Sequence, residues 1–148
     1  MYLSRLITTA VVLAIVTSVS ADSAIAACYG SSCHGLDPNT EGCAAGAYTV
    51  SQSNNYLWQL GNVHLYVQLR YSPQCAANWS RSYTQEGQGR YIKADLQGYQ
   101  GFTIVQGPGP GSYLSAYTNM VNGQSWQCAT GAMKSWVSPW YNGNPACG

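Results

Sequence analysis

Side chains that could transfer a proton or attack a substrate are scarce in this 148-residue chain. His34 and His64 are the candidate general bases. A glycosidase would have to take its acid and its base from Asp37, Glu41, Glu86 and Asp95. Four of these six residues have a simpler structural interpretation: His64 alternates with apolar residues, His34 adjoins Cys33, Asp37-Pro38 indicates a turn, and Glu86 lies in a glycine-containing loop. We therefore expect no catalytic residues, no cofactor and no enzymatic activity.

The six cysteines, Cys28, Cys33, Cys43, Cys75, Cys128 and Cys147, form an even set, which predicts three disulfides in an oxidising compartment. Cys128 and Cys147 are far in sequence from the other four, which favours a disulfide between these two and leaves the other four to pair among themselves. Residues 28–46 contain little to bury besides Tyr29 and Leu36, so this loop needs covalent attachment to the strand that Cys75 follows. We expect Cys33–Cys75 with Cys28–Cys43, or else Cys28–Cys75 with Cys33–Cys43. A zinc site is the weaker alternative, because Cys33-His34 lacks a second clustered pair.

The N-terminal segment has the three parts of a secretory signal peptide: Arg5, the apolar run Leu6–Val19, and Ala24-Ile25-Ala26 as a cleavage pattern. Cleavage after Ala26 leaves one disulfide-stabilised domain over residues 27–148, without a transmembrane segment. The alternative is a lipobox ending at Cys28, although Asp22 and Ser23 separate that cysteine from the apolar run.

The charge pattern argues against nucleic acid and anionic membranes as partners, because charged residues make up only 7% of the chain and the net charge is +1. Arg70 and Arg81 flank a short Tyr-Ser-Pro segment, and their simplest roles are structural, with Arg70 stacking on Trp79. Solubility must come from the neutral polar residues, which together with Tyr are typical of adaptable binding surfaces.

Short alternating segments without an amphipathic helix predict a small all-β sandwich or barrel of about six to seven antiparallel strands. The clearest strand is 63–71, with Val63, Leu65, Val67 and Leu69 on one face. Residues 47–52 and 56–60 precede it, with a two-residue turn at Gly61-Asn62. A helical turn is expected over 74–82, followed by strands at 91–96, 99–105 and 113–121. Asn122-Gly123 predicts a hairpin turn with a return strand at 124–130, and a last strand is expected at 134–137.

The aromatic residues, 12 Tyr and 5 Trp with a single Phe, exceed what a small core needs. Trp58 and Trp79 are the expected core members. The candidate binding surface comprises Tyr66, Tyr113, Tyr117, Trp136, Trp140 and Tyr141. An exposed group of Tyr and Trp with few charges is typical of a protein interface or of a sugar-stacking face.

Two stretches carry a family resemblance: CYGSSCHGLDPNTEGC at 28–43 and VQLRYSPQCAANWSR at 67–81. Their pattern, C-x4-C-x-G-x-D-P, then G-C, then L-R-Y-S-x-x-C-x-x-x-W, resembles domain-of-unknown-function family 2690 over residues 28–82. This is a family of small secreted or membrane-tethered actinobacterial proteins. The resemblance implies a bacterial, extracellular, disulfide-bonded β-module and assigns it no catalytic residues.

We predict a secreted, non-catalytic adaptor that docks onto another secreted protein, as in an extracellular toxin or inhibitor complex. A carbohydrate or cell-wall binding module is the first alternative, and it requires two coplanar exposed rings spaced like successive sugars. A small protease inhibitor that presents the Gly107–Gly111 loop is the second alternative.

Overall fold

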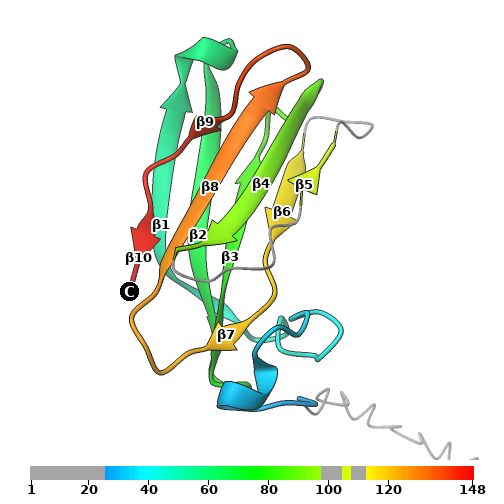
Figure 1. Ribbon diagram of the computed structural model, residues 1–148, viewed down its shortest axis with the longest axis vertical. Helices are drawn as coiled ribbons and strands as arrows, with labels where there is room; N and C mark the ends of the chain where they lie inside the picture. The colour runs from blue at the N-terminus through cyan, green and yellow to red at the C-terminus, as the bar shows by residue number, and fades with distance from the viewer. Residues whose placement is uncertain (1–25, 98–104, 108–112) are drawn as a thin grey trace, which may run out of the picture.

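The computed structural model describes residues 26–97, 105–107 and 113–148, which fold into two antiparallel β-sheets packed face to face (Figure 1). Sheet A has the order β1 (Tyr48–Leu57), β2 (Val63–Ser72), β3 (Ala77–Thr84) and β6 (Leu114–Tyr117), with β7 (Val121–Asn122) also paired to β3. Sheet B has the order β10 (Ala146–Cys147), β8 (Cys128–Ser135), β4 (Arg90–Leu96) and β5 (Val105–Gln106), with β9 (Tyr141–Asn142) paired to β8.

This architecture confirms the predicted all-β sandwich, and the sheets do not close into the barrel that was its alternative. The described residues contain two 3-10 turns, η1 (Gly30–Cys33) and η2 (Trp58–Leu60), but no α-helix, and no helix among them could cross a membrane. The described ranges hold ten strands rather than six or seven. Four of them are two-residue pairings that were too short to show a periodic pattern.

The core lies between the sheets and is built from alternating side chains. Val63, Leu65, Val67 and Leu69 on β2 are all buried, as predicted, and pack with Ile92, Leu96 and Met133 of sheet B. The inner face of β3 carries small polar residues instead: Ser80, Ser82 and Thr84 are fully buried. Opposite them in sheet B is Gly131, where an added Cβ would overlap Ser82 Oγ. The sheets therefore approach closely at this point.

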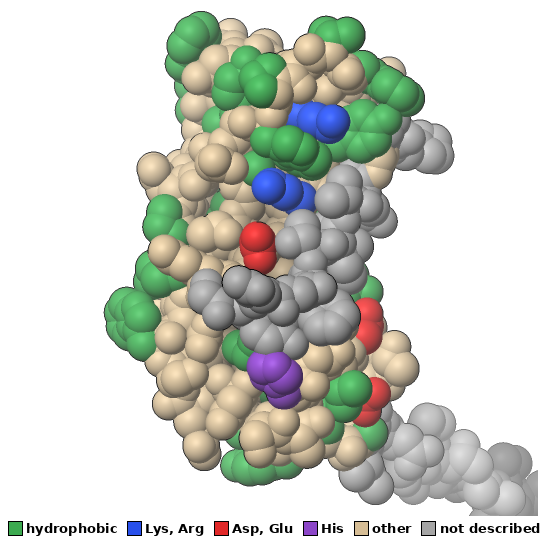
Figure 2. All heavy atoms as spheres, in the orientation of Figure 1, with side chains coloured by type: hydrophobic (Ala, Val, Ile, Leu, Met, Phe, Trp, Pro, Cys, Tyr) green, Lys and Arg blue, Asp and Glu red, His purple; other side chains and the backbone are tan. Residues whose placement is uncertain are grey.

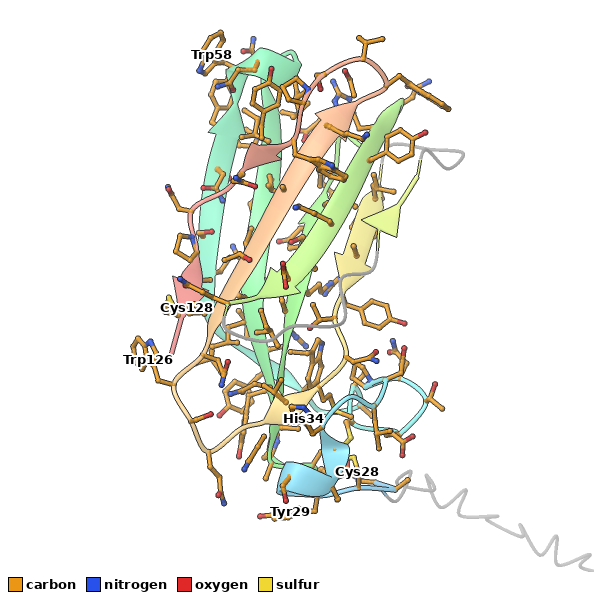
Figure 3. The ribbon with its side chains drawn as sticks, viewed as in Figure 1. Cys28, Tyr29, His34, Trp58, Trp126 and Cys128 are labelled. Carbon is orange, nitrogen blue, oxygen red and sulfur yellow. A yellow bond between two sulfur atoms is a disulfide. The ribbon has the colours of Figure 1, made fainter. Side chains whose placement is uncertain are left out.

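The hairpin between β1 and β2 is longer than predicted. The expected segments 47–52 and 56–60 are mostly one continuous strand, β1, and the connection spans residues 58–62 instead of two residues. Gly61 and Asn62 do take left-handed φ angles of 83° and 65°, but a 3-10 turn that buries Leu60 precedes them. Trp58 lies in this loop and is 69% exposed, so its assignment to the core was wrong (Figure 3). Trp79, the other expected core member, is buried.

The predicted helical turn over 74–82 was wrong. Ser72 Oγ does accept a hydrogen bond from the Cys75 N–H, which is the capping contact that the sequence indicated. The chain then reverses at Ala76, whose φ is 47°, and β3 pairs with β2 from Ser72↔Ala77 onward. As a strand, residues 77–84 place Trp79, Arg81 and Tyr83 on one face of sheet A. Pairing with β2 therefore outweighs the local preference of this segment for a helical turn.

Asn122-Gly123 is not a hairpin turn, so the hairpin with a return strand at 124–130 was wrong, and only residues 128–130 of that segment are strand, as the start of β8. β7 pairs with β3, and residues 123–127 cross from sheet A to sheet B, where β8 begins at Cys128. An added Cβ at Gly123 would lie 2.6 Å from the Tyr71 ring and 2.9 Å from the Ala76 carbonyl oxygen, so close packing explains this glycine.

The other strand predictions had mixed outcomes. The strand expected at 91–96 is β4, the segment 113–121 forms only β6 and part of β7, and the start of 134–137 belongs to β8. Leu114, Ala116, Thr118 and Met120 are buried as their alternation indicated. Most of the predicted strand 99–105 and of the Gly107–Gly111 loop lies outside the described residues.

The cysteines form three disulfides, of which Cys128–Cys147 was predicted and joins a register pair of β8 and β10. Both pairings proposed for the first four were wrong, because the structure joins Cys28 to Cys33 and Cys43 to Cys75. The η1 turn brings Cys28 back to Cys33 within one short loop. The expected attachment to the end of β2 is present, but it is made by Cys43. With Cys28 Sγ in a disulfide, no thiol is left there for a lipid thioether.

The N-terminal loop, residues 26–47, packs over one end of sheet A (Figure 1). The sulfur atoms of its three cysteines and of Cys75 lie within 4.8 Å of one another and form a second buried cluster with Trp79 and Met120. A group of four such cysteines has the composition of a zinc site, but disulfide sulfur is not the thiolate ligand that zinc requires.

Candidate binding face of sheet A

The outer face of sheet A, turned away from sheet B, carries rows of polar and aromatic side chains. Directly paired residues in an antiparallel sheet point to the same face, so the strand register fixes these rows. They comprise Tyr56 and His64; Asn54, Tyr66, Tyr83 and Ser115; Gln52, Gln68, Arg81 and Tyr117; and Thr49, Arg70 and Trp79. We call this surface the sheet A face.

Five rings make a continuous line across the sheet A face. Ring centroids are 5.3 Å apart for Tyr56 and His64, 6.1 Å for His64 and Tyr66, and 4.7 Å for Tyr66 and Tyr83. Tyr113, just before β6, continues the line at 6.2 Å from Tyr83. Tyr66 and Tyr83 are stacked with their planes only 11° apart. Their rings therefore cover one another and stand on the sheet with edges outward.

Arg81 braces this line of rings. Its guanidinium lies 5.2 Å from the Tyr83 ring centroid, and its Nη2 donates a hydrogen bond of 2.5 Å to the Tyr113 hydroxyl. Burial raises the pKa of Tyr83, neighbouring Tyr66 raises it further, and Arg81 opposes this effect only partly. The Tyr83 hydroxyl thus stays protonated and is a hydrogen-bond donor at neutral pH.

A pocket of about 290 Å³ opens on the same face beside the N-terminal loop, and we call it the arginine pocket. Its lining consists of Asn39, Ala44, Arg70, Trp79, Arg81, Ser115 and Tyr117. The Arg70 guanidinium is fixed by hydrogen bonds to Thr49 Oγ1 at 2.8 Å and to the Ala47 carbonyl oxygen at 2.7 Å. Trp79 is only 4% exposed and packs against the sulfur cluster. The disulfide-bonded loop therefore forms one wall of the pocket.

A larger cleft of about 430 Å³ lies elsewhere, lined by residues that include Tyr48, Tyr71, Gln124 and Trp126. None of the described residues that line it has a charged side chain. Trp126 is 73% exposed and points away from the sheets (Figure 3). We place the candidate site at the arginine pocket and the adjoining rings, because directional and charged groups converge there.

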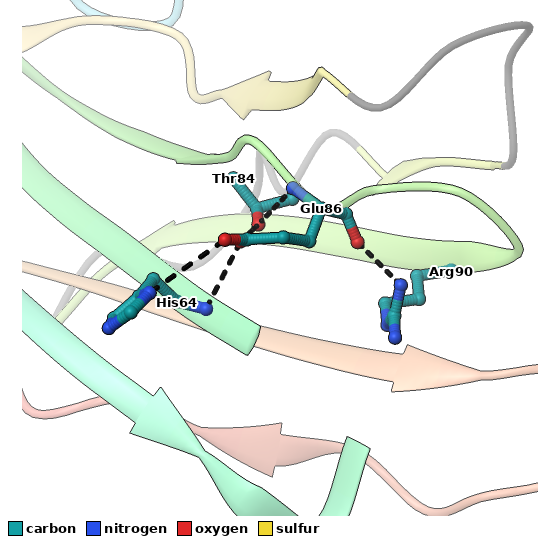
Figure 4. A network of polar contacts seen from close by, with 4 residues as sticks. All are labelled: His64, Thr84, Glu86 and Arg90. Atoms are coloured by element: carbon teal, nitrogen blue, oxygen red, sulfur yellow. Dashed lines mark hydrogen bonds and ion pairs between the residues drawn. The ribbon is translucent and has the colours of Figure 1, made fainter. Parts of the chain in front are cut away.

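His64 and Glu86, weighed above as acid–base candidates, do meet (Figure 4). Their Nδ1 and Oε1 atoms are 3.8 Å apart, and both side chains are about 40% exposed. Glu86 Oε2 accepts hydrogen bonds from the His64 backbone N–H and the Thr84 hydroxyl. Burial opposes a low pKa at Glu86, but these hydrogen bonds and the His64 charge outweigh it and lower that pKa.

The Glu86 network joins loops of the structure. Arg90 donates a hydrogen bond of 2.6 Å to the Glu86 carbonyl oxygen (Figure 4). It also donates to the Leu60 carbonyl oxygen at 2.8 Å, and so it links the β3–β4 and β1–β2 connections. The nearest hydroxyl in the network, on Thr84, hydrogen-bonds to Glu86 rather than to His64. Among the described residues, these contacts account for the positions of the two loops.

A second aromatic group covers the outer face of sheet B, where basic side chains lie among hydrophobic ones (Figure 2). Lys93 and Lys134 have their Nζ atoms 5.2 and 5.3 Å from the Trp140 ring centroid, and Lys134 is equally close to Tyr91. Trp136 contacts Tyr91 edge to face. The lysines therefore cover aromatic faces that would otherwise be open to a ligand.

The six predicted surface residues fall in three places. Tyr66, Tyr113 and Tyr117 belong to the sheet A face, Trp136 and Trp140 lie in the β8–β9 connection beside Tyr91 and the lysines of sheet B, and Tyr141 packs against the core. Sequence reasoning missed Tyr56, His64, Tyr83 and Arg81 as neighbours of Tyr66. Predicting a second strand over 77–84, paired with the strand at 63–71, would have placed Tyr83 and Arg81 beside Tyr66. Residues 74–82 were instead predicted to form a helical turn.

Taken together, the fold and this face define a small disulfide-bonded β-sandwich with one open, aromatic and arginine-bearing sheet face. The chain belongs to the family described as protein of unknown function (DUF2690), whose model matches residues 31–131. The match extends well past the motifs at 28–82, through β6 and into β8. No curated protein and no solved structure matches the chain significantly.

Proposed function

We propose that this protein is a secreted, non-catalytic binding module that docks onto another secreted protein through the sheet A face. The observation that supports it most is the continuous line of rings from Tyr56 to Tyr113, braced by Arg81. Tyrosine and arginine are enriched at interface hot spots because they combine a large contact area with directional hydrogen bonds. Three disulfides fit an extracellular location.

The orientation of the rings favours a protein partner over a polysaccharide. A sugar-binding platform needs ring faces that lie open and coplanar. Tyr66 and Tyr83 are instead parallel and face to face at 4.7 Å, so each covers a face of the other. Their exposed parts are ring edges, which suit the irregular polar surface of a protein better than the flat face of a pyranose.

The test compares capture of partner protein by variants of the two aromatic surfaces. The purified, oxidised protein is immobilised, exposed to culture fluid of its producer, and the bound proteins are identified and quantified. We expect the double variant Tyr66→Ala/Tyr83→Ala to lose about tenfold or more of a specific partner. The matched control, Trp136→Ala/Trp140→Ala on sheet B, should retain it.

Three outcomes would contradict the proposal. Capture that depends on the tryptophans of sheet B and not on the tyrosines would place the interface on the other sheet. Retention on chitin, peptidoglycan or cellulose at high salt, lost in the tyrosine variant, would favour the carbohydrate alternative. A protein that stays monomeric and captures nothing would remove the adaptor function. The inhibitor alternative is checked by adding the protein to trypsin-like and subtilisin-like proteases.

A further inference from the structure

The arginine pocket holds two positive charges side by side in a chain that has few charges. Arg70 and Arg81 both line it, and they are two of the five basic residues that follow residue 26. Within the part of the chain that the structure describes, neither guanidinium forms an ion pair with a carboxylate. Burial lowers the pKa of Arg70, and the charge of Arg81 lowers it further, so the two groups repel one another. Such an arrangement favours a bound anion.

Both guanidiniums are held in place before any ligand arrives. Arg70 donates to Thr49 Oγ1 and to the Ala47 carbonyl oxygen, whereas Arg81 lies over Tyr83 and donates to the Tyr113 hydroxyl. A guanidinium has five N–H donors in a planar fork. These contacts use only some of them, and the remainder match the two oxygens of a carboxylate. Little side-chain ordering is therefore needed on binding.

The size and the net charge of the pocket indicate which kind of anion it would bind. Its volume of about 290 Å³ is at the low end for small-molecule sites and suits one side chain rather than an oligosaccharide. Asp37 lies at its border, where its Oδ2 accepts a hydrogen bond of 3.1 Å from Tyr117 and its Oδ1 caps the backbone N–H groups of Asn39 and Thr40. Two arginines offset by one aspartate leave about one positive charge, which matches a monoanion better than a phosphate.

We propose that the arginine pocket binds a carboxylate of the docking partner, presented by an Asp or Glu side chain. This assignment rests on the proposed function, because it names the group of the partner protein that the sheet A face recognises. The aromatic line adjoins the pocket through Arg81, so a partner that covers the rings would place an acidic side chain within its reach.

The first experiment needs no identified partner. The isotope-labelled, oxidised protein is titrated with the peptide acetyl-Gly-Asp-Gly-amide and followed by NMR at the arginine Nε–H and Trp79 Nε1–H signals. We expect saturable shifts at Arg70, Arg81 and Trp79, no shifts with acetyl-Gly-Asn-Gly-amide, and weaker binding of inorganic phosphate. Arg81→Gln should weaken peptide binding by about tenfold, as loss of a charge-assisted contact does. Lys134→Gln, the same charge change on sheet B, should leave it unaltered.

Absence of saturable shifts with the aspartate peptide would overturn the proposal, as would equal binding of the asparagine peptide. Tighter binding of phosphate than of the peptide would overturn the carboxylate assignment. The capture experiment separates this proposal from the function on which it rests. If Arg81→Gln still captures the partner fully whereas Tyr66→Ala/Tyr83→Ala does not, the docking function stands and the pocket assignment fails. Arg81→Lys keeps the charge but loses the fork, and it should restore only part of the peptide affinity.

Discussion

Replacing Gly131 with alanine should destabilise the protein by about 2 kcal/mol through overpacking between the sheets. An added Cβ would overlap Ser82 Oγ and lie 2.9 Å from Val67 Cγ2. Both neighbours are fully buried on the inner face of sheet A, so neither can move into solvent. The backbone of Gly131 is not in the left-handed region, and alanine would even gain about 0.4–1 kcal/mol from the unfolded state. The expected loss is therefore entirely steric.

A double-mutant cycle with Ser82 tests this steric account. The Ser82 hydroxyl is buried and has no hydrogen-bond partner in the described part of the chain, so Ser82→Ala alone should be neutral or stabilise by up to about 1 kcal/mol. Since Ser82→Ala removes the overlapping oxygen, Gly131→Ala in that background should cost at least about 1 kcal/mol less than in the wild type.

The assay is equilibrium unfolding in guanidinium chloride with the disulfides intact, comparing four proteins at an unchanged m-value. Additive effects of the two substitutions, or a Gly131→Ala variant as stable as the wild type, would refute the close approach of the sheets at this point.

Three further changes test other contacts. Glu86→Gln should lower the free energy of unfolding by about 0.5 kcal/mol at pH 7, a small effect because solvent screens the attraction between the half-exposed Glu86 and His64 side chains. The pKa of Glu86 is depressed in the folded state, so the difference in stability should fade as the pH falls below about 4.3. Unfolding measured as a function of pH checks this. Replacing both Cys43 and Cys75 with serine should cost about 3.7 kcal/mol of stability, and replacing both Cys28 and Cys33 only about 2 kcal/mol, because the first bond restricts a loop of 32 residues in the unfolded chain and the second a loop of 5. Equal losses of thermal stability would contradict this ranking. Asn55→Ala should cost about 2 kcal/mol in denaturant unfolding, because it leaves the Asn144 N–H and the Leu65 carbonyl oxygen unpaired; a neutral effect would count against these hydrogen bonds.

The fold could be predicted where the alternation of apolar and polar residues in the sequence matches the buried and exposed faces of a strand, as it does in β2. Val63, Leu65, Val67 and Leu69 alternate with polar residues, and one buried face is the only arrangement that satisfies this pattern. The Cys128–Cys147 bond was equally predictable, because the two cysteines are remote from the other four in sequence. In contrast, the pairing of the first four cysteines depends on the η1 turn, and its GSSC sequence has no periodic signal.

The candidate site was only partly predictable for a related reason. Tyr66 and His64 were placed on the polar face of their strand, but their contacts with Tyr83 and Tyr56 come from strand pairing. Pairing depends on which strands become neighbours, and single-strand alternation does not encode this. The arginine pocket also needs Asn39 from a loop far away in sequence, which the Cys43–Cys75 bond brings against the sheet.

The sulfur cluster has a practical consequence for anyone who prepares this protein. Cys28 Sγ and Cys43 Sγ belong to different disulfides yet lie 3.8 Å apart, and all four sulfur atoms fit within 4.8 Å. A thiolate formed at one of them would have the sulfur of the other bond within easy reach, so thiol–disulfide exchange inside the cluster would move sulfur atoms by less than about 3 Å. Isomers with shuffled bonds would have the same mass, the same count of free thiols and the same compactness. Proteolytic mapping of the bonds, with cleavage between Cys33 and Cys43, would distinguish a correctly oxidised batch from a scrambled one.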